Sequence, residues 1–167
     1  MDREKLIKHG KKAKLDNKDK KILKALDKDA RASIASISRK TGIQRDSVHY
    51  RIKRMKRSGT IRFFHTVLNP SILGCEIYSY VNFTLHNLTP EKEKSMIKNF
   101  ENNPHVVYAA KTTGKWDFMI NIAAEDLDQF DKVLNKLRVD FADIIKEYES
   151  SPIIQEYKYD YMVDLIE

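Results

Sequence analysis

The sequence predicts an α+β protein made of two small domains, a basic helical domain followed by an acidic domain of strands and helices. Charge changes sign along the chain. Residues 1–68 hold 21 Lys and Arg against 7 Asp and Glu, a net +14, whereas residues 69–167 hold 10 against 17, a net −7. Apolar residues recur at helical spacing in the first part and switch between strand and helical spacing in the second. A chain of 167 residues is long enough to bury a core in each domain.

The composition excludes several classes of protein. Cys75 is the only cysteine, so an intramolecular disulfide and a thiolate zinc site are both excluded. No apolar run approaches the ~20 residues that a membrane-spanning helix needs. The N-terminus also lacks the apolar core of a signal peptide. We therefore expect a cytoplasmic protein with no membrane partner and no cofactor.

The chain is expected to open with a basic arm and then a first helix. Residues 1–14 are rich in lysine and interrupted by Gly10, a composition typical of a mobile arm or a frayed helix. Whether this arm touches DNA stays open. Asp16 is a plausible N-cap, and Asp19 adds negative charge in the first turn. The predicted helix ends near Asp27, and its apolar positions are Ile22, Leu23 and Leu26.

Two further helices are predicted to meet at a glycine. Ser33 can cap the second helix, Gly42 supplies a sharp turn, and Ile43 fills the space between the helices. The third helix runs from Gln44 or Arg45 to Ser58, and Gly59 ends it. Its apolar positions at i, i+4 and i+7 are Val48, Ile52 and Met55. This spacing predicts a helix-turn-helix at about residues 34–53.

The third helix carries a dense row of cations, with six cations and one anion in residues 45–57. With the apolar stripe facing the core, the opposite face points to solvent or to DNA. Cations there can neutralise phosphates, and polar side chains can contact base edges in the major groove. A basic helix that is merely solvated is the alternative. The predicted DNA-binding residues are Gln44, Arg45, Ser47, His49, Tyr50, Arg51, Lys53 and Arg54.

The β-branched and aromatic residues 60–68 predict a short strand or wing packed on these helices. A DNA-binding domain is therefore expected at 15–68, a linker at 69–74 and a second domain at 75–167.

Within the second domain, periodicity predicts strands at 75–86, 105–112, 116–124 and 144–150. Helices are expected to follow caps at Thr89 and Asp126, and the first has Met96, Ile97 and Phe100 as its buried stripe.

The predicted order, β-α-β-β-α-β, is that of the ferredoxin-like fold, in which both helices cover one face of an antiparallel sheet. Apolar and aromatic residues also alternate toward the other face. We expect a second copy of the chain to cover it, which predicts a homodimer. Residues 153–165 continue to alternate, so they could extend a sheet or cross to a partner.

Four motifs, in this order and at these distances, carry a resemblance to a known family. They are LDNKDKKIL from Leu15, DAR from Asp29, TGIQRDSVHYRIKRMKRSGTI from Thr41 and TTGKWDFMINI from Thr112. From Leu15 to about Tyr157 the chain resembles the feast/famine (Lrp/AsnC) transcription regulators, the family of the leucine-responsive regulatory protein. The resemblance implies a winged helix-turn-helix joined to a ligand-binding regulatory domain. It also implies dimers that pair through the sheet and often assemble into higher oligomers.

The same resemblance implies a small amino acid as effector, bound between dimers near a hairpin turn with a Gly-x-x-Asp element. In this chain the element is Gly114 and Asp117, preceded by Thr112 and Thr113. A carboxylate there could hold an α-ammonium group, and loop amides could hold an α-carboxylate. Alternatively, Gly114 simply makes the hairpin turn and Asp117 caps it.

The leading hypothesis is a sequence-specific, DNA-binding transcription regulator that is not an enzyme. One alternative is a chromatin-like architectural protein that binds DNA with little sequence preference. The other is an enzyme on a similar two-domain architecture, as in sirohaem decarboxylases, which would need histidines placed for a tetrapyrrole. The chain's histidines form no pair at helical ligand spacing; they are His9, His49, His65, His86 and His105.

Overall fold

The computed structural model describes residues 12–159 and 162–166, and the chain forms two compact units. Unit 2 spans Val67–Tyr157. Unit 1 contains the described residues up to Thr66 together with those after Tyr157. The sequence predicts a second domain at 75–167, whereas the structure places the described residues after Tyr157 in unit 1. They belong there because the short 3-10 helix η3 (Val163–Leu165) packs beside α1 (Asn17–Lys28), which is part of unit 1.

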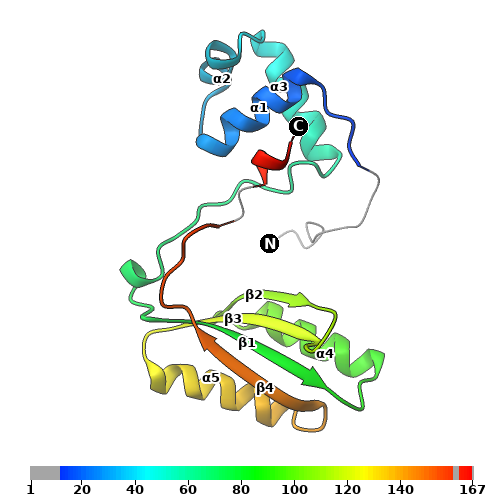
Figure 1. Ribbon diagram of the computed structural model, residues 1–167, viewed down its shortest axis with the longest axis vertical. Helices are drawn as coiled ribbons and strands as arrows, with labels where there is room; N and C mark the ends of the chain where they lie inside the picture. Colours follow the sequence, from blue (N-terminus) through cyan, green and yellow to red (C-terminus); the bar gives the residue numbers. More distant parts are fainter. Residues whose placement is uncertain (1–11, 160–161, 167) are drawn as a thin grey trace. The chain divides into compact units, whose positions relative to one another are not determined.

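Three helices form the core of unit 1: α1, α2 (Ile34–Thr41) and α3 (Arg45–Arg57) (Figure 1). Each helix contributes to a single cluster of buried side chains. Its fully buried members include Ile22, Ile37 and Val48, one from each helix. The complete cluster is Ile22, Ala25, Leu26, Ile37, Ile43, Val48, Met55 and Ile61.

The turn between α2 and α3 follows from local chemistry. Ser33 caps α2, since its hydroxyl accepts a hydrogen bond from the Ser36 N–H. Gly42 ends the helix at φ 71°, a left-handed conformation that disfavours residues with a Cβ atom. Ile43 then turns into the core and is only 5% exposed. At the other end of α3, Gly59 follows the cap residue Ser58 and also has a positive φ, 76°.

The strand predicted at residues 60–68 is wrong, because these residues lie in irregular backbone. The predicted packing of this segment on the helices is confirmed at Ile61. Ile61 is buried against the helices, and its N–H donates to the Met55 carbonyl at 3.0 Å. A strand needs a neighbouring strand to satisfy its backbone groups, and no described segment pairs with this one. The 3-10 helix η2 (Ser71–Leu73) occupies the predicted linker.

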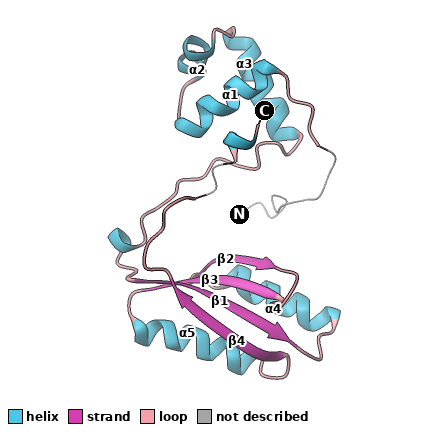
Figure 2. Cartoon of the chain, viewed as in Figure 1, coloured by secondary structure: helices cyan, strands magenta, loops and turns pink. Residues whose placement is uncertain are grey.

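Unit 2 has the predicted β-α-β-β-α-β order (Figures 1 and 2). Neighbouring strands are antiparallel throughout, in the order β2-β3-β1-β4, as the ferredoxin-like fold requires. After β4, the Ile153 N–H still donates to the Tyr78 carbonyl, and the rest of the described tail forms no strand. The elements are β1 (Ile77–Leu85), α4 (Pro90–Asn102), β2 (Val106–Lys111), β3 (Phe118–Ala124), α5 (Leu127–Asp140) and β4 (Ile145–Pro152).

Both helices of unit 2 cover the same face of the sheet, where they enclose an apolar core. Ile97 was expected to be buried in it but is 37% exposed, because Met96 and Phe100 alone point from α4 into the core. The core residues are Val81, Phe83, Met96, Phe100, Phe118, Ile120, Ile122, Leu134, Leu137, Phe141 and Ile144.

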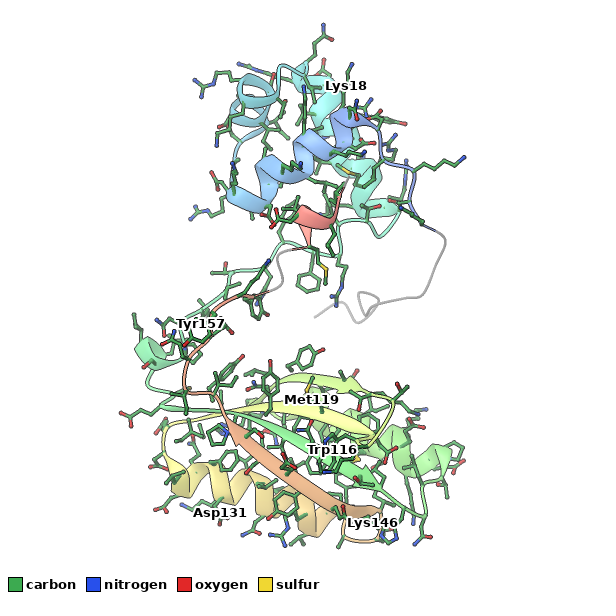
Figure 3. The ribbon with its side chains drawn as sticks, in the orientation of Figure 1. Lys18, Trp116, Met119, Asp131, Lys146 and Tyr157 are labelled. Carbon is green, nitrogen blue, oxygen red and sulfur yellow. The ribbon has the colours of Figure 1, made fainter. Side chains whose placement is uncertain are left out.

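The opposite face of the sheet, here called the open face, carries aromatic and polar residues. Tyr80 of β1, Asn121 of β3 and Tyr108 of β2 are neighbours in the strand register and form one row across this face. Met119, also on β3, is labelled in Figure 3 and is two residues from Asn121 on the same face. No helix of unit 2 covers the open face.

Candidate nucleic-acid interface and effector site

The outward side of α3 presents polar and cationic side chains to solvent. Of the residues predicted to contact DNA, the structure leaves five exposed, and Tyr50 among them is 60% exposed although its ring is aromatic. Cations clustered on one face of a helix, as Arg45 and Lys53 are here, are typical of a surface that binds nucleic acid. The five exposed residues are Gln44, Arg45, His49, Tyr50 and Lys53.

The other three predicted DNA contacts, Ser47, Arg51 and Arg54, are half-buried on one flank of α3, where the two arginines bind carboxylates at the start of α1. Arg51 Nη1 donates to Asp16 Oδ2 at 2.7 Å and to Asp19 Oδ1 at 2.8 Å. Arg54 Nη2 donates to Asp19 Oδ2, and Arg51 Nε donates to Ser47 Oγ at 3.3 Å. The structure therefore divides the predicted set into an exposed face and a flank that holds α3 against α1.

Asp16 and Asp19 reach this flank because they form the capping box at the start of α1. The Asp19 N–H donates to Asp16 Oδ1 at 2.9 Å, and the Asp16 N–H donates back to Asp19 Oδ2 at 3.2 Å. The Asp19 N–H and then the Arg51 guanidinium lower the pKa of the Asp16 carboxyl from 3.8 to about 2. The same ion pairs raise the pKa of Arg51, first through Asp16. Asp16 and Arg51 are therefore both charged throughout the neutral range.

Sequence reasoning missed this network because its two sides are 32 to 35 residues apart in the chain. One feature of the sequence does point to the network: Ser47, Arg51 and Arg54 lie at i, i+4 and i+7, so they share one flank of α3. Their spacing does not reveal whether that flank faces DNA or another helix.

The predicted effector residues lie together at the turn between β2 and β3. Gly114 has φ 110°, so a residue with a Cβ would be strained there. The Thr112 N–H donates to the Asp117 carbonyl at 2.8 Å, and the Thr112 hydroxyl donates to the Trp116 carbonyl at 2.6 Å. Thr113 is exposed beside them. Figure 3 labels Trp116 at this end of the sheet.

Asp117 also has a structural role in this turn. Its Oδ2 accepts a hydrogen bond from the Leu85 N–H at 2.7 Å, while its own N–H donates to the Phe83 carbonyl at 2.8 Å. These contacts join the turn to the end of β1. They are the capping role that the sequence left open as an alternative, and they use one of the two carboxylate oxygens.

The fold and the exposed face of α3 define a helix-turn-helix DNA-binding protein with a ferredoxin-like second domain. Comparison with protein families agrees. Residues 15–56 match the AsnC-type helix-turn-helix domain, and residues 79–163 match the Lrp/AsnC ligand binding domain. Since these matches cover most of the chain, the protein belongs to the Lrp/AsnC family of transcription regulators.

Relatives with similar sequences carry the same description. The chain is 31% identical over 121 residues to the HTH-type transcriptional regulator FL11 of Pyrococcus horikoshii. This match covers 72% of this chain and 78% of the relative. It is also 32% identical over 126 residues to the HTH-type transcriptional regulator Rv2324 of Mycobacterium tuberculosis, a match that covers 75% of this chain and 83% of the relative. The resemblance seen in the sequence motifs is confirmed.

Solved structures agree on the fold. Escherichia coli AsnC superposes with a TM-score of 0.76 at 24% identity, covering 90% of this chain and 99% of that one. The transcriptional regulator NMB0573 of Neisseria meningitidis, solved in complex with L-Met, gives a TM-score of 0.77 at 19% identity, covering 87% and 94%. Among the described residues of this protein, no helix is long and apolar enough to cross a membrane.

Proposed function

We propose that a homodimer of this chain regulates transcription by binding a specific, pseudo-palindromic DNA site with one α3 helix from each copy. The observation that carries the proposal is the exposed cationic face of α3, opposite its buried stripe. A helix of this kind fits the major groove. Two copies related by a twofold axis would read half-sites about one helical turn, roughly 34 Å, apart.

Within this face we assign different tasks to different residues. Arg45 and Lys53 are exposed cations that can neutralise phosphates and set the register of the helix on the duplex. Gln44, His49 and Tyr50 offer hydrogen-bonding groups for base edges. This assignment is narrower than the set predicted from the sequence, because Ser47, Arg51 and Arg54 are bonded within unit 1.

The open face of the sheet supports the dimer. Asn121 is only 1% exposed, yet neither its amide nitrogen nor its carbonyl oxygen has a hydrogen-bond partner among the described residues. Buried polar groups are almost always hydrogen-bonded. A second copy placed over this face would bury the exposed rings of Tyr80 and Tyr108. It could also hydrogen-bond the Asn121 amide if the side chains that now close that amide to solvent moved.

We further propose that a small α-amino acid binds at the β2–β3 turn and changes the DNA affinity of the dimer. The exposed backbone of the turn and the second carboxylate oxygen of Asp117 are the groups available to such a ligand. Titrating the 20 amino acids into the protein with its DNA site, with fluorescence anisotropy as the readout, tests this. If no amino acid changes the affinity, the effector proposal is wrong.

Selection of bound fragments from genomic DNA tests the proposed function, and Tyr50→Ala is the variant that probes its face. We expect the wild type to enrich one pseudo-palindromic motif. We expect Tyr50→Ala to weaken binding to that motif by about 1–3 kcal/mol, the usual effect of a lost base contact.

The affinity of the wild-type protein for the enriched motif should also fall steeply as the salt concentration rises, because phosphate contacts release counterions.

Tyr157→Ala is the matched control, since Tyr157 is a 94% exposed tyrosine in unit 2. Its DNA affinity should equal that of the wild type. If unrelated DNA competes as well as the enriched motif, the protein is an architectural DNA-binding protein instead. An enzymatic role has less support, because each described histidine comes from a different segment: α3 (His49), the loop after it (His65), the residues after β1 (His86) and those before β2 (His105).

A further inference from the structure

The carboxylate of Asp19 is buried in unit 1 although it is charged and lies in the first turn of a helix. Its side chain is 1% exposed, whereas that of its capping partner Asp16 is 54% exposed. A buried carboxylate is stable only when cations and hydrogen bonds compensate for the lost water. For Asp19 that compensation comes from α3, through Arg51 and Arg54.

The contacts are spaced so that they fix the rotation of α3 about its own axis. Arg51 and Arg54 bind the same carboxylate from positions three residues apart, and Arg51 is also bonded to Ser47 one turn earlier. On a helix that turns 100° per residue, this flank lies beside the buried stripe of Val48 and Met55. The apolar contacts alone would permit a small roll, while the paired charges on one side would oppose it.

We propose that Asp19 is a positioning residue for DNA recognition, which holds α3 at the rotation that points Tyr50 and Lys53 outward. The inference rests on the DNA-binding face proposed above. A roll of about 20° would move a side-chain atom ~6 Å from the helix axis by about 2 Å, enough to break a hydrogen bond to a base. Arg51 and Arg54 act in the same clamp. If either arginine left Asp19 to bind DNA, the buried carboxylate would lose a cationic partner.

Asp19→Asn tests the proposal, because it keeps the shape of the side chain and removes its charge. The matched control is Asp27→Asn, the same change at an exposed position of the same helix. The full-length chain is titrated against a duplex selected by the wild type from genomic DNA and against a scrambled duplex of equal length. We expect the ratio of the two affinities to fall at least about tenfold in Asp19→Asn, the scale of one lost base contact, and to stay unchanged in Asp27→Asn.

The ratio separates positioning from simple loss of folded protein, since unfolding lowers both affinities by the same factor. Arg51→Gln adds a second readout. If Arg51 only positions α3, the ratio falls while the slope of log affinity against log salt stays at the wild-type value. A slope that drops by about 0.9 would identify a phosphate contact and overturn the proposal.

Circular dichroism first establishes that each variant is folded. If Asp19→Asn is not, Arg51→Lys replaces it, because lysine keeps the charge but loses the planar, multi-donor geometry. We expect a lower affinity ratio for Arg51→Lys, and a wild-type ratio would overturn the inference. A wild-type protein without any sequence preference would overturn the proposed function and this inference with it. A wild-type preference retained in Asp19→Asn would overturn only the inference.

Discussion

Replacing Tyr80 with aspartate is expected to separate the proposed dimer into monomers and to weaken DNA binding by about 10²–10⁴-fold. Tyr80 lies on the open face, in register with Asn121, whose buried amide has no partner among the described residues. A carboxylate at Tyr80 would have to lose its water when a second copy covers this face, and that loss is costly without a paired cation. A monomer presents one α3 helix instead of two, so the gain from binding both half-sites together is lost.

Sedimentation equilibrium and DNA titration measure the two effects of this variant. Tyr148→Asp is the matched control. Tyr148 is 38% exposed, almost the same as Tyr80 at 37%, but it faces the helix side of the sheet, where Arg138 lies over its ring. The control should remain a dimer. If Tyr80→Asp also remains a dimer at low micromolar concentration, the open face is not the interface.

Replacing Val48 with aspartate is expected to unfold unit 1 and to abolish DNA binding, while unit 2 stays folded and dimeric. Val48 is fully buried between the helices of unit 1, beside Ile37 and Met55. An unpaired charge in that core should destabilise the unit by more than about 4 kcal/mol. A three-helix unit of this size has only a few kcal/mol of stability to lose. The core of unit 2 shares no residue with it.

Limited proteolysis and circular dichroism check this second outcome. The variant should lose helical signal and yield a resistant fragment close to residues 67–157, the range of unit 2. His49→Asp introduces the same charge at the neighbouring, exposed position and should leave both units folded. Loss of structure in both units of Val48→Asp would show that the two cores fold as one.

Much of the fold could be predicted because its signals are local. The caps Asp16, Ser33, Thr89 and Asp126 each accept the hydrogen bond expected of an N-cap. The alternation of Val81 with its polar neighbours placed β1 correctly, and four strands with two helices in this order leave few topologies open. The strand predicted at residues 60–68 failed because β-branched residues favour extended backbone but do not supply a neighbouring strand.

The candidate sites were predictable only in part. The turn containing Gly114 and Asp117 forms as its sequence indicates, since a positive φ and a short hairpin are local features. The hydrogen bond to Leu85 uses one carboxylate oxygen of Asp117, and the proposed effector would use the other. On α3, helical periodicity correctly placed Tyr50 and Lys53 outward, but it could not show which arginines form ion pairs with α1.

By itself, the sequence determined that this protein has a basic helix-turn-helix, an antiparallel sheet with two helices, and a cationic third helix. These follow from periodicity, capping and charge, which act over a few residues. Only the tertiary structure decided that Arg51 and Arg54 bind Asp19 of α1. Their partner Asp19 lies 32 and 35 residues earlier, and a long-range ion pair forms only where packing of the helices buries one carboxylate beside two guanidinium groups.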